Sequence, residues 1–152
     1  MSARALRLTG PILLLLFAAS AQAQEGHPAK GTWVGQWGPT LTVQSRIVLV
    51  IDHDGKTMSG VLNPGPNAVP LKVARLDITP GTPSPGKGVP PVLPVFKIHL
   101  EADARDANGV PVAISAEGTM HSVALPNRWI TGTWTQTSGG KSVTSEFKIT
   151  RQ

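Results

Sequence analysis

Through most of the chain, apolar residues recur at every second position between turn signals spaced about ten residues apart. Successive side chains of a β-strand point to opposite faces, so this period is typical of strands that bury one face. After residue 23 no segment shows the helical period. Turn chemistry separates several strands, at Asp54-Gly55, Asn108-Gly109 and Ser138-Gly139-Gly140. The predicted strands are residues 31–37, 41–52, 56–62, 69–78, 94–102, 110–120, 128–136 and 142–150.

Eight consecutive strands with short connections predict an all-β fold, an eight-stranded antiparallel up-and-down meander. Such a meander removes its exposed edge strands by closing into a barrel, or nearly so. We therefore expect a single β-barrel domain over residues 31–152. The alternation assigns the following residues to the inward face: Leu41, Val43, Ile47, Leu49, Ile51, Phe96, Ile98, Leu100, Val143, Phe147 and Ile149.

The four tryptophans lie in two similar stretches, GTWVGQWG at residues 31–38 and WITGTWTQ at residues 129–136. In each stretch a tryptophan and a glycine two positions apart share the predicted inward face. Glycine inside a strand leaves room for a bulky neighbour, so an indole can lie across the barrel there. We interpret Trp33 and Trp134 as residues that close the barrel. Trp37 and Trp129 are candidates for a rim that contacts a ligand or a partner.

The motif Gly31-x-Trp33, with Arg151 at the end of the last strand, resembles the signature shared by lipocalins, fatty-acid-binding proteins and avidins. In those families the tryptophan plugs one barrel end and a basic side chain from the final strand lies over it. The resemblance implies these roles for Trp33 and Arg151. The opening strand also looks like that of avidins, but Gly35 stands where avidins place a ligand-binding asparagine. Biotin binding is therefore not implied.

A longer resemblance covers most of residues 31–151. The stretch ITGTWTQ at residues 130–136, the Gly-Gly turn after it and the final Ile149-Thr150-Arg151 are similar to a secreted bacterial module. That module is a lipocalin-like (calycin-type) β-barrel that stands alone or precedes an α/β-hydrolase domain. Its Gly-x-Trp-x-Gly, Asp-Gly and Val-Pro motifs have counterparts at residues 31–35, 54–55 and 69–70. The resemblance implies fold and compartment and contributes no catalytic residues.

The first 23 residues have the three parts of a secretory signal peptide. Arg4 and Arg7 make a basic start, an apolar run follows over residues 12–19, and Ala21-Gln22-Ala23 matches the pattern that signal peptidase cuts. The run is too short for a permanent membrane anchor. We expect a periplasmic or extracellular protein that begins at Gln24, with a flexible N-terminus over residues 24–30.

Composition argues against several functional classes. The chain has no cysteine, so neither a disulfide framework nor a lipid-modified cysteine is expected. Removal of Arg4 and Arg7 lowers the formal charge from +5 to +3, and the remaining basic residues are scattered singly. Because there is also no tyrosine for base stacking, nucleic acid is not an expected partner.

Titratable residues form no recognisable catalytic or metal-binding motif. Asp52-His53-Asp54 places an imidazole between two carboxylates, but neighbouring strand residues point to opposite faces and Asp favours turns. We interpret this stretch as a solvated turn. His99 and the pair Glu101 and Asp103 are assigned to a polar outer face, with no partner at ligand spacing. We therefore expect no catalytic, cofactor-binding or metal-binding residues, and no enzyme activity.

Residues 80–94 hold six prolines and three glycines, which predicts an unpaired loop with polyproline character. Two interpretations stay open for a loop of this length. It is either a mobile excursion from the surface or a lid or partner-contacting rim at one barrel mouth. In the second case the apolar contact surface comes from Val89, Val92 and Leu93.

Two functions from different classes remain open. The protein is either a secreted, non-catalytic binding or accessory module that contacts another protein, or a lipocalin-like carrier of a small apolar ligand in the barrel. Side chains just fill an eight-stranded barrel or leave space in it for one ligand. The many inward aliphatic side chains favour a filled interior and hence the binding module. The identity of the protein partner or apolar ligand does not follow from the sequence.

Overall fold

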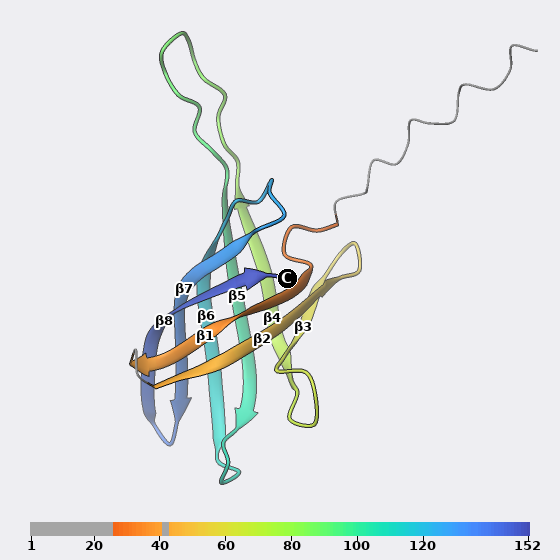
Figure 1. The fold of residues 1–152 in the computed structure, drawn as a ribbon, viewed down its shortest axis with the longest axis vertical. Coiled ribbons are helices and arrows are strands. Elements are labelled where there is room, and N and C mark those ends of the chain that lie inside the picture. The colour runs from red at the N-terminus through yellow and green to blue at the C-terminus, as the bar shows by residue number, and fades with distance from the viewer. Residues whose placement is uncertain (1–25, 41–42) are drawn as a thin grey trace, which may run out of the picture.

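The computed structural model describes residues 26–40 and 43–152, which form eight β-strands (Figure 1). The expected signal peptide at residues 1–23, the first two residues of the expected flexible start and Leu41 lie outside the described residues. Each strand corresponds to one predicted strand, with ends that differ by at most three residues. The strands are β1 (Gly31–Thr40), β2 (Val43–His53), β3 (Met58–Leu62), β4 (Val69–Thr79), β5 (Val95–Arg105), β6 (Pro111–His121), β7 (Trp129–Ser138) and β8 (Lys141–Arg151).

Every strand pairs antiparallel with its neighbours in the sequence, and β1 also pairs with β8, which closes the sheet into a barrel. The predicted all-β, eight-stranded up-and-down barrel is therefore confirmed. The β1–β8 closure runs over five residue pairs, from Trp33–Arg151 to Trp37–Phe147. The shortest pairing in the ring is that of β3 with β4, which share only Val61–Pro70 and Leu62–Val69.

The two ends of the barrel carry different connections. The end that we call the arm end carries the residues before β1 and the connections 54–57, 80–94 and 122–128. The opposite end, which we call the hairpin end, carries the connections 63–68, 106–110 and 139–140. Residues 80–94, which we call the arm, project far beyond the strands in Figure 1. No helix in the described part of the chain is long and apolar enough to cross a membrane.

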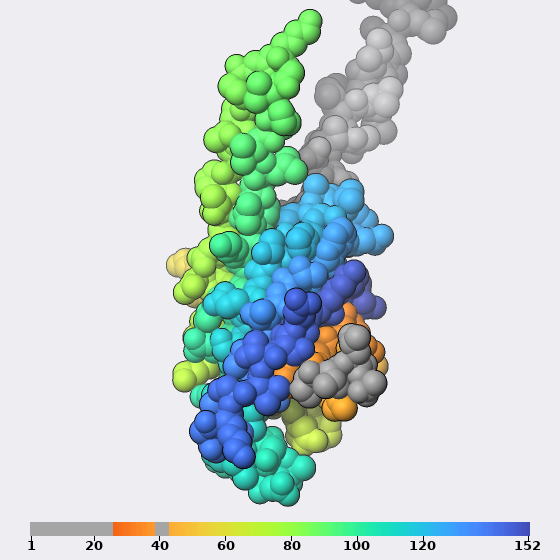
Figure 2. All heavy atoms as spheres, turned by 90° about the vertical axis from the view of Figure 1, so that its left-hand side faces the viewer, coloured from red at the N-terminus to blue at the C-terminus, as the bar shows by residue number. Residues whose placement is uncertain are grey.

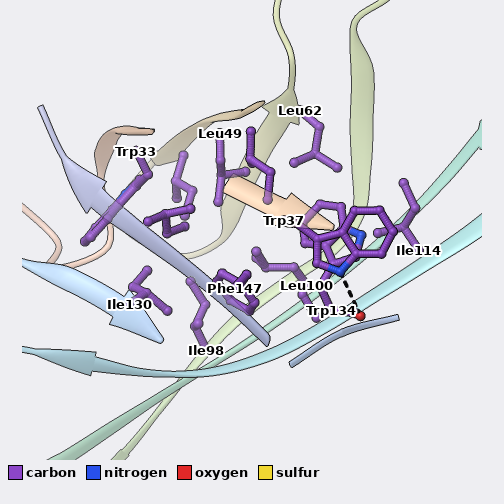
Figure 3. Close-up of a cluster of buried hydrophobic side chains, with 14 of the residues drawn as sticks. Trp33, Trp37, Leu49, Leu62, Ile98, Leu100, Ile114, Ile130, Trp134 and Phe147 are labelled. Atoms are coloured by element: carbon purple, nitrogen blue, oxygen red, sulfur yellow. Dashed lines mark hydrogen bonds between the residues drawn. The ribbon is translucent and has the colours of Figure 1, made fainter. Parts of the chain in front are cut away.

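Side chains from every strand fill the barrel interior, and Figure 3 shows this cluster. Alternate residues of each strand point inward, as the pleat of a strand requires. Apolar burial contributes about 25 cal/mol per Å² and is the main favourable term for a chain with no disulfide. The largest fully buried side chains are Trp33, Leu49, Ile51, Ile98, Ile130 and Ile149.

Two residues predicted to face inward are exposed. Val43 and Val143 lie within the first three residues of β2 and β8, at the hairpin end of the barrel. The alternation of the sequence continues to these strand tips, but the inward face of the sheet opens to solvent there. Phe96, at the arm end of β5, is half-buried. The period therefore predicts which face a residue lies on, and the position along the barrel decides whether that face is buried.

Gly35 and Gly132 mark close approaches between neighbouring strands. A Cβ atom on Gly35 would overlap the carbonyl oxygen of Lys148 in β8, and one on Gly132 would overlap that of Glu117 in β6. Neither position has room for any side chain. Each glycine lies on the inward face two residues from a buried indole, which lets the sheet bend tightly where the tryptophans pack.

Candidate functional site

The arm continues the β4–β5 hairpin. Thr82 and Val92 exchange two backbone hydrogen bonds, with N···O distances of 2.9 and 3.0 Å. This pair keeps the register of Thr79 with Val95, which is the last pair of β4 and β5. The prediction that the prolines and glycines exclude pairing throughout residues 80–94 is therefore wrong at Thr82 and Val92.

Two prolines explain why this pair is isolated. In an antiparallel ladder, residue pairs that exchange hydrogen bonds alternate with pairs that do not. The position two residues before the Thr82–Val92 pair is therefore also a hydrogen-bonding one. Pro80 stands there opposite Pro94, and neither residue has an N–H to donate. The ladder stops at these prolines and resumes for one pair beyond them.

The apolar side chains of the arm are exposed, although part of its backbone is hydrogen-bonded. The Ser84 hydroxyl donates to the carbonyl oxygen of Gly86 at 2.8 Å and fastens the tip. Val89, Val92 and Leu93 are 50%, 63% and 74% exposed, and Figure 2 shows the arm standing clear of the body. Val92 and Leu93 are sequence neighbours in an extended segment, so they project from opposite faces. Lys87 is the one charged residue of the arm.

Trp33 lies under the N-terminal segment at the arm end. Its side chain is fully buried, and its indole Nε1–H donates to the carbonyl oxygen of Ala29 at 2.8 Å. The sequence predicts a flexible start that includes residues 26–30, whereas the structure places them in a turn that packs on the barrel. In that turn the Lys30 N–H donates to the carbonyl oxygen of His27 at 2.9 Å, and Ala29 is fully buried.

The arginine that is buried at the arm end is Arg128. It is 3% exposed, and it donates to the carbonyl oxygens of Leu125 at 3.1 Å and Pro28 at 3.0 Å. It thereby ties the β6–β7 connection to the N-terminal turn above Trp33. Sequence reasoning did not single out Arg128, although the predicted strand 128–136 places it on the same face as Ile130 and Trp134. This shared face was the available signal.

Arg151 lies beside Trp33, as its place in the sequence suggests. The two residues are paired across β1 and β8, and the Arg151 side chain is half-buried. Its guanidinium group lies against Gly31, where an added Cβ would come within 2.9 Å of Nε. The backbone N–H of Arg151 donates to the carbonyl oxygen of Arg128 at 2.9 Å. The stacking of this guanidinium on the indole stays a prediction.

Trp134 lies toward the hairpin end with Trp37, and Figure 3 shows both at a distance from Trp33. The Trp37 and Trp134 ring centroids are 5.9 Å apart, and Trp37 donates its indole N–H to the carbonyl oxygen of Trp134 at 3.1 Å. Phe147 meets Trp134 edge-on, with centroids 6.2 Å apart. Indoles therefore occupy the interior at two levels. Trp33 lies under the arm end, and Trp37 and Trp134 lie toward the hairpin end.

Trp129 lies on the outer face of β7. Its ring stacks on His121, with centroids 5.5 Å apart, and the Lys148 ammonium lies 5.9 Å from the ring centroid. His121 Nε2 is also hydrogen-bonded to the Thr131 hydroxyl at 2.8 Å. The five residues predicted for a ligand or partner rim therefore occupy three places. Val89, Val92 and Leu93 share the arm, Trp37 is in the core and Trp129 is on the outer wall.

His99 lies between two carboxylates on the outer face, which sequence reasoning missed. Its Nδ1 is hydrogen-bonded to Glu117 of β6, and its Nε2 to Glu101 of β5 at 3.0 Å. Burial lowers the pKa of His99, but the hydrogen bonds to Glu101 and Glu117 outweigh burial and raise the pKa above 6.5. Glu117 lies 18 residues away in sequence, so only the strand register reveals this contact.

Asp54 forms the turn between β2 and β3. Its Oδ1 accepts hydrogen bonds from the backbone N–H groups of Lys56 and Thr57, both at 2.8 Å. These bonds, that of Thr57 first, lower the pKa of Asp54 to about 2. Asp52 instead forms an exposed ion pair with Lys30 at 2.7 Å. Within residues 26–40 and 43–152, no three His, Asp or Glu side chains gather closely enough to hold a metal ion.

Comparisons of the chain with protein-family models, with curated proteins and with solved structures find no match. The eight-stranded antiparallel barrel is compatible with a lipocalin-like fold on its topology. This barrel combines a partly paired apolar arm, a filled interior and a short β3–β4 pairing.

Proposed function

We propose that the protein is a secreted, non-catalytic binding or accessory module of lipocalin-like (calycin-type) architecture that contacts another protein through its arm. The proposal is carried by the exposure of Val92 and Leu93 on opposite faces of a backbone-paired extension. The signal sequence and the resemblance of residues 31–151 to secreted modules support the compartment. N-terminal sequencing of the exported protein should then begin at Gln24.

Exposed apolar side chains on a partly paired extension are suited to binding. Full burial of a Val or Leu side chain contributes about 1.5–3 kcal/mol relative to exposure. A backbone held by the Thr82–Val92 pair and the Ser84 hydroxyl loses less conformational entropy on binding than an unpaired loop would. With Lys87 as its one charge, the arm fits an apolar groove on a partner protein.

The prolines also limit unwanted association of the arm. An exposed two-stranded ribbon offers unpaired N–H and C=O groups to other strands. Six prolines remove six of the N–H donors of residues 80–94. The apolar side chains thus stay available while β-sheet aggregation through the backbone is suppressed.

The filled interior favours contact on the outside over the alternative function, a carrier with an apolar ligand in the barrel. The core cluster includes side chains from all eight strands, among them the three indoles of Trp33, Trp37 and Trp134. A ligand in the interior would have to displace some of them. We therefore place the interaction surface on the arm.

Site-specific cross-linking tests the proposal. A photoreactive amino acid would replace Leu93 in one variant and Val43 in another, because Val43 is an exposed apolar residue at the opposite end. In the cells that export the protein, we expect one discrete cross-linked protein from position 93 and none from position 43. Identical products from both positions, or no product from position 93, would contradict the proposal.

A shortened variant separates binding from folding. A short Gly-containing turn in place of residues 80–94 should leave the barrel intact, because loop length changes the closure entropy only slightly. A photoreactive residue at Leu125, which is exposed in the β6–β7 connection at the arm end, should cross-link the partner in the full-length protein and lose it in the shortened one. Retention of the same partner would show that the arm is dispensable.

A further inference from the structure

The wall of the barrel opens between β3 and β4. The two strands pair only at Val61–Pro70 and Leu62–Val69, near the hairpin end. Just beyond these pairs, Lys72 is an extra residue in β4, because Leu71 and Val73 pair with adjacent residues of β5. Such a bulge bends and twists its strand. Toward the arm end a pocket of about 440 Å³ lies between β3 and β4, a volume typical of small-molecule sites.

The pocket has an apolar floor and a cationic rim. Met58, Ala74 and Leu76 line it and pack against the hydrophobic core with part of their surface exposed. Three cations also line it, and no carboxylate does: Lys56, Lys72 and Arg75. Lys72 and Arg75 each form an exposed ion pair, with Asp103 at 3.5 Å and Asp77 at 2.9 Å. Pairs of this kind contribute little and are exchanged easily.

Two histidines complete the lining at the arm end. His27 and His53 stack with ring centroids 4.1 Å apart and an interplanar angle of 11°. His53 Nδ1 accepts a hydrogen bond from the Gly55 N–H at 3.1 Å, whereas the buried Nδ1 of His27 has no hydrogen-bond partner in the structure. Burial, and then the proximity of His53, lowers the pKa of His27. This nitrogen is not exposed to solvent, so the His27 ring lines the pocket through its other atoms.

We propose that the opening between β3 and β4 binds a small anionic amphiphile, a carboxylate on a short apolar chain. The carboxylate is attracted by Lys56, Lys72 and Arg75, while the chain lies on Met58 and Leu76. The site is in the barrel wall, apart from both the filled interior and the arm. It therefore goes beyond the proposed function and does not rest on it.

Three ligands of equal chain length test the charge preference. Octanoate, octanol and octylamine would be titrated into protein whose methionine methyl groups carry ¹³C. Met58 lines the pocket and Met120 is buried in the core, so Met120 is an internal control. We expect octanoate to bind with a stoichiometry of one and to shift the Met58 methyl resonance without shifting that of Met120. Equal affinity for octanol, equal shifts of both methyl groups, or no Met58 shift at millimolar octanoate would overturn the proposal.

Variants test the individual groups. Lys56→Gln and Arg75→Gln should each weaken octanoate binding by about two- to fivefold, as the loss of an exposed charge contact does. Lys141→Gln, at the hairpin end, should have no effect. His27→Phe keeps a ring against His53 and should leave octanoate binding unchanged within about twofold, because the buried Nδ1 makes no contact with the ligand. Wild-type affinity in both Gln variants of the pocket would overturn the proposal. The protein with the shortened arm should still bind octanoate, which separates this site from the arm.

Discussion

Trp37 donates its indole N–H to the backbone carbonyl of Trp134, while the buried indole N–H of Trp134 has no hydrogen-bond partner in the structure. Trp33, under the arm end, is better satisfied because its N–H reaches the carbonyl oxygen of Ala29 at 2.8 Å. Two tryptophans of the same core therefore differ in one hydrogen bond, and this difference should appear in their substitution energies.

Replacement of these tryptophans by Phe should separate the two environments. Trp33→Phe loses the hydrogen bond and leaves the buried Ala29 carbonyl without it, at a cost of about 1–3 kcal/mol beyond lost packing. Trp134→Phe removes an unpaired buried donor, which offsets part of its lost packing. Trp33→Phe should therefore lower the free energy of unfolding more in denaturant melts. As a control, both Ala variants should lose about 3–5 kcal/mol. Equal losses for the two Phe variants would contradict this account.

Gly132→Ala should destabilise the barrel although Ala is the smallest side chain that can be added. The new Cβ would overlap the carbonyl oxygen of Glu117, and β6 and β7 would have to separate. Overpacking of this kind costs about 1–3 kcal/mol. Gly86→Ala is the matched control, because no atom lies within 4 Å of its added Cβ. Its effect on the thermal midpoint should be negligible, and a loss similar to that of Gly132→Ala would argue against the steric explanation.

Stability should fall as the pH rises through the pKa of His99. The pKa of His99 is raised in the folded protein. Protonated His99 therefore stabilises the fold fully at pH values below about 6.5, which is the pKa of histidine in the unfolded chain. This contribution is lost above the raised pKa. His99 then loses one proton, and with it the N–H group that one of the two carboxylates, Glu101 or Glu117, accepts from. Thermal melts from pH 6 to pH 9 should show the loss in the wild type and less of it in His99→Gln. Arg75, paired with His99 from β4, stays charged over this range.

Arg128 should matter more for stability than Arg151. Arg128→Ala removes two hydrogen bonds from a buried cation and should cost about 2–3 kcal/mol. Arg151→Ala removes a half-buried side chain that lies against Gly31, for which about 1 kcal/mol or less is expected. Urea unfolding of the two variants measures the order. The reverse order would show that Arg151 is the cation that stabilises the arm end.

The strands and their order could be predicted because the period of two is a local signal. Ile47, Leu49 and Ile51 share one face of β2 and the structure buries all three, whereas Val48 and Val50 on the other face are half-buried. Burial at the strand tips could not be predicted in this way. Val43 continues the same alternation, but it lies beyond the last layer of the core.

Contacts that depend on strand register or on the N-terminal segment could not be predicted from the sequence. His99 meets Glu117 only because β5 and β6 pair in a register that a change of one residue would break. His27 reaches His53 only because residues 26–30 fold back onto the barrel. The prediction of an unpaired arm was wrong at Thr82 and Val92 for another reason. Proline content predicts unpaired backbone, and the single Thr82–Val92 pair forms between the prolines, at residues that keep their N–H groups.

The two residue pairs that join β3 to β4 make the ring of hydrogen bonds uneven in strength. A closed barrel unfolds locally by parting one seam, and the seam with the fewest pairs opens at the lowest free energy. The amide proton of Leu62, which points toward β4, should therefore exchange with solvent deuterium sooner than that of Val34, which points toward β8 in the longer β1–β8 seam. If this order of exchange is found, β3 and β4 are the strands at which the closed barrel first opens into a sheet with two edges.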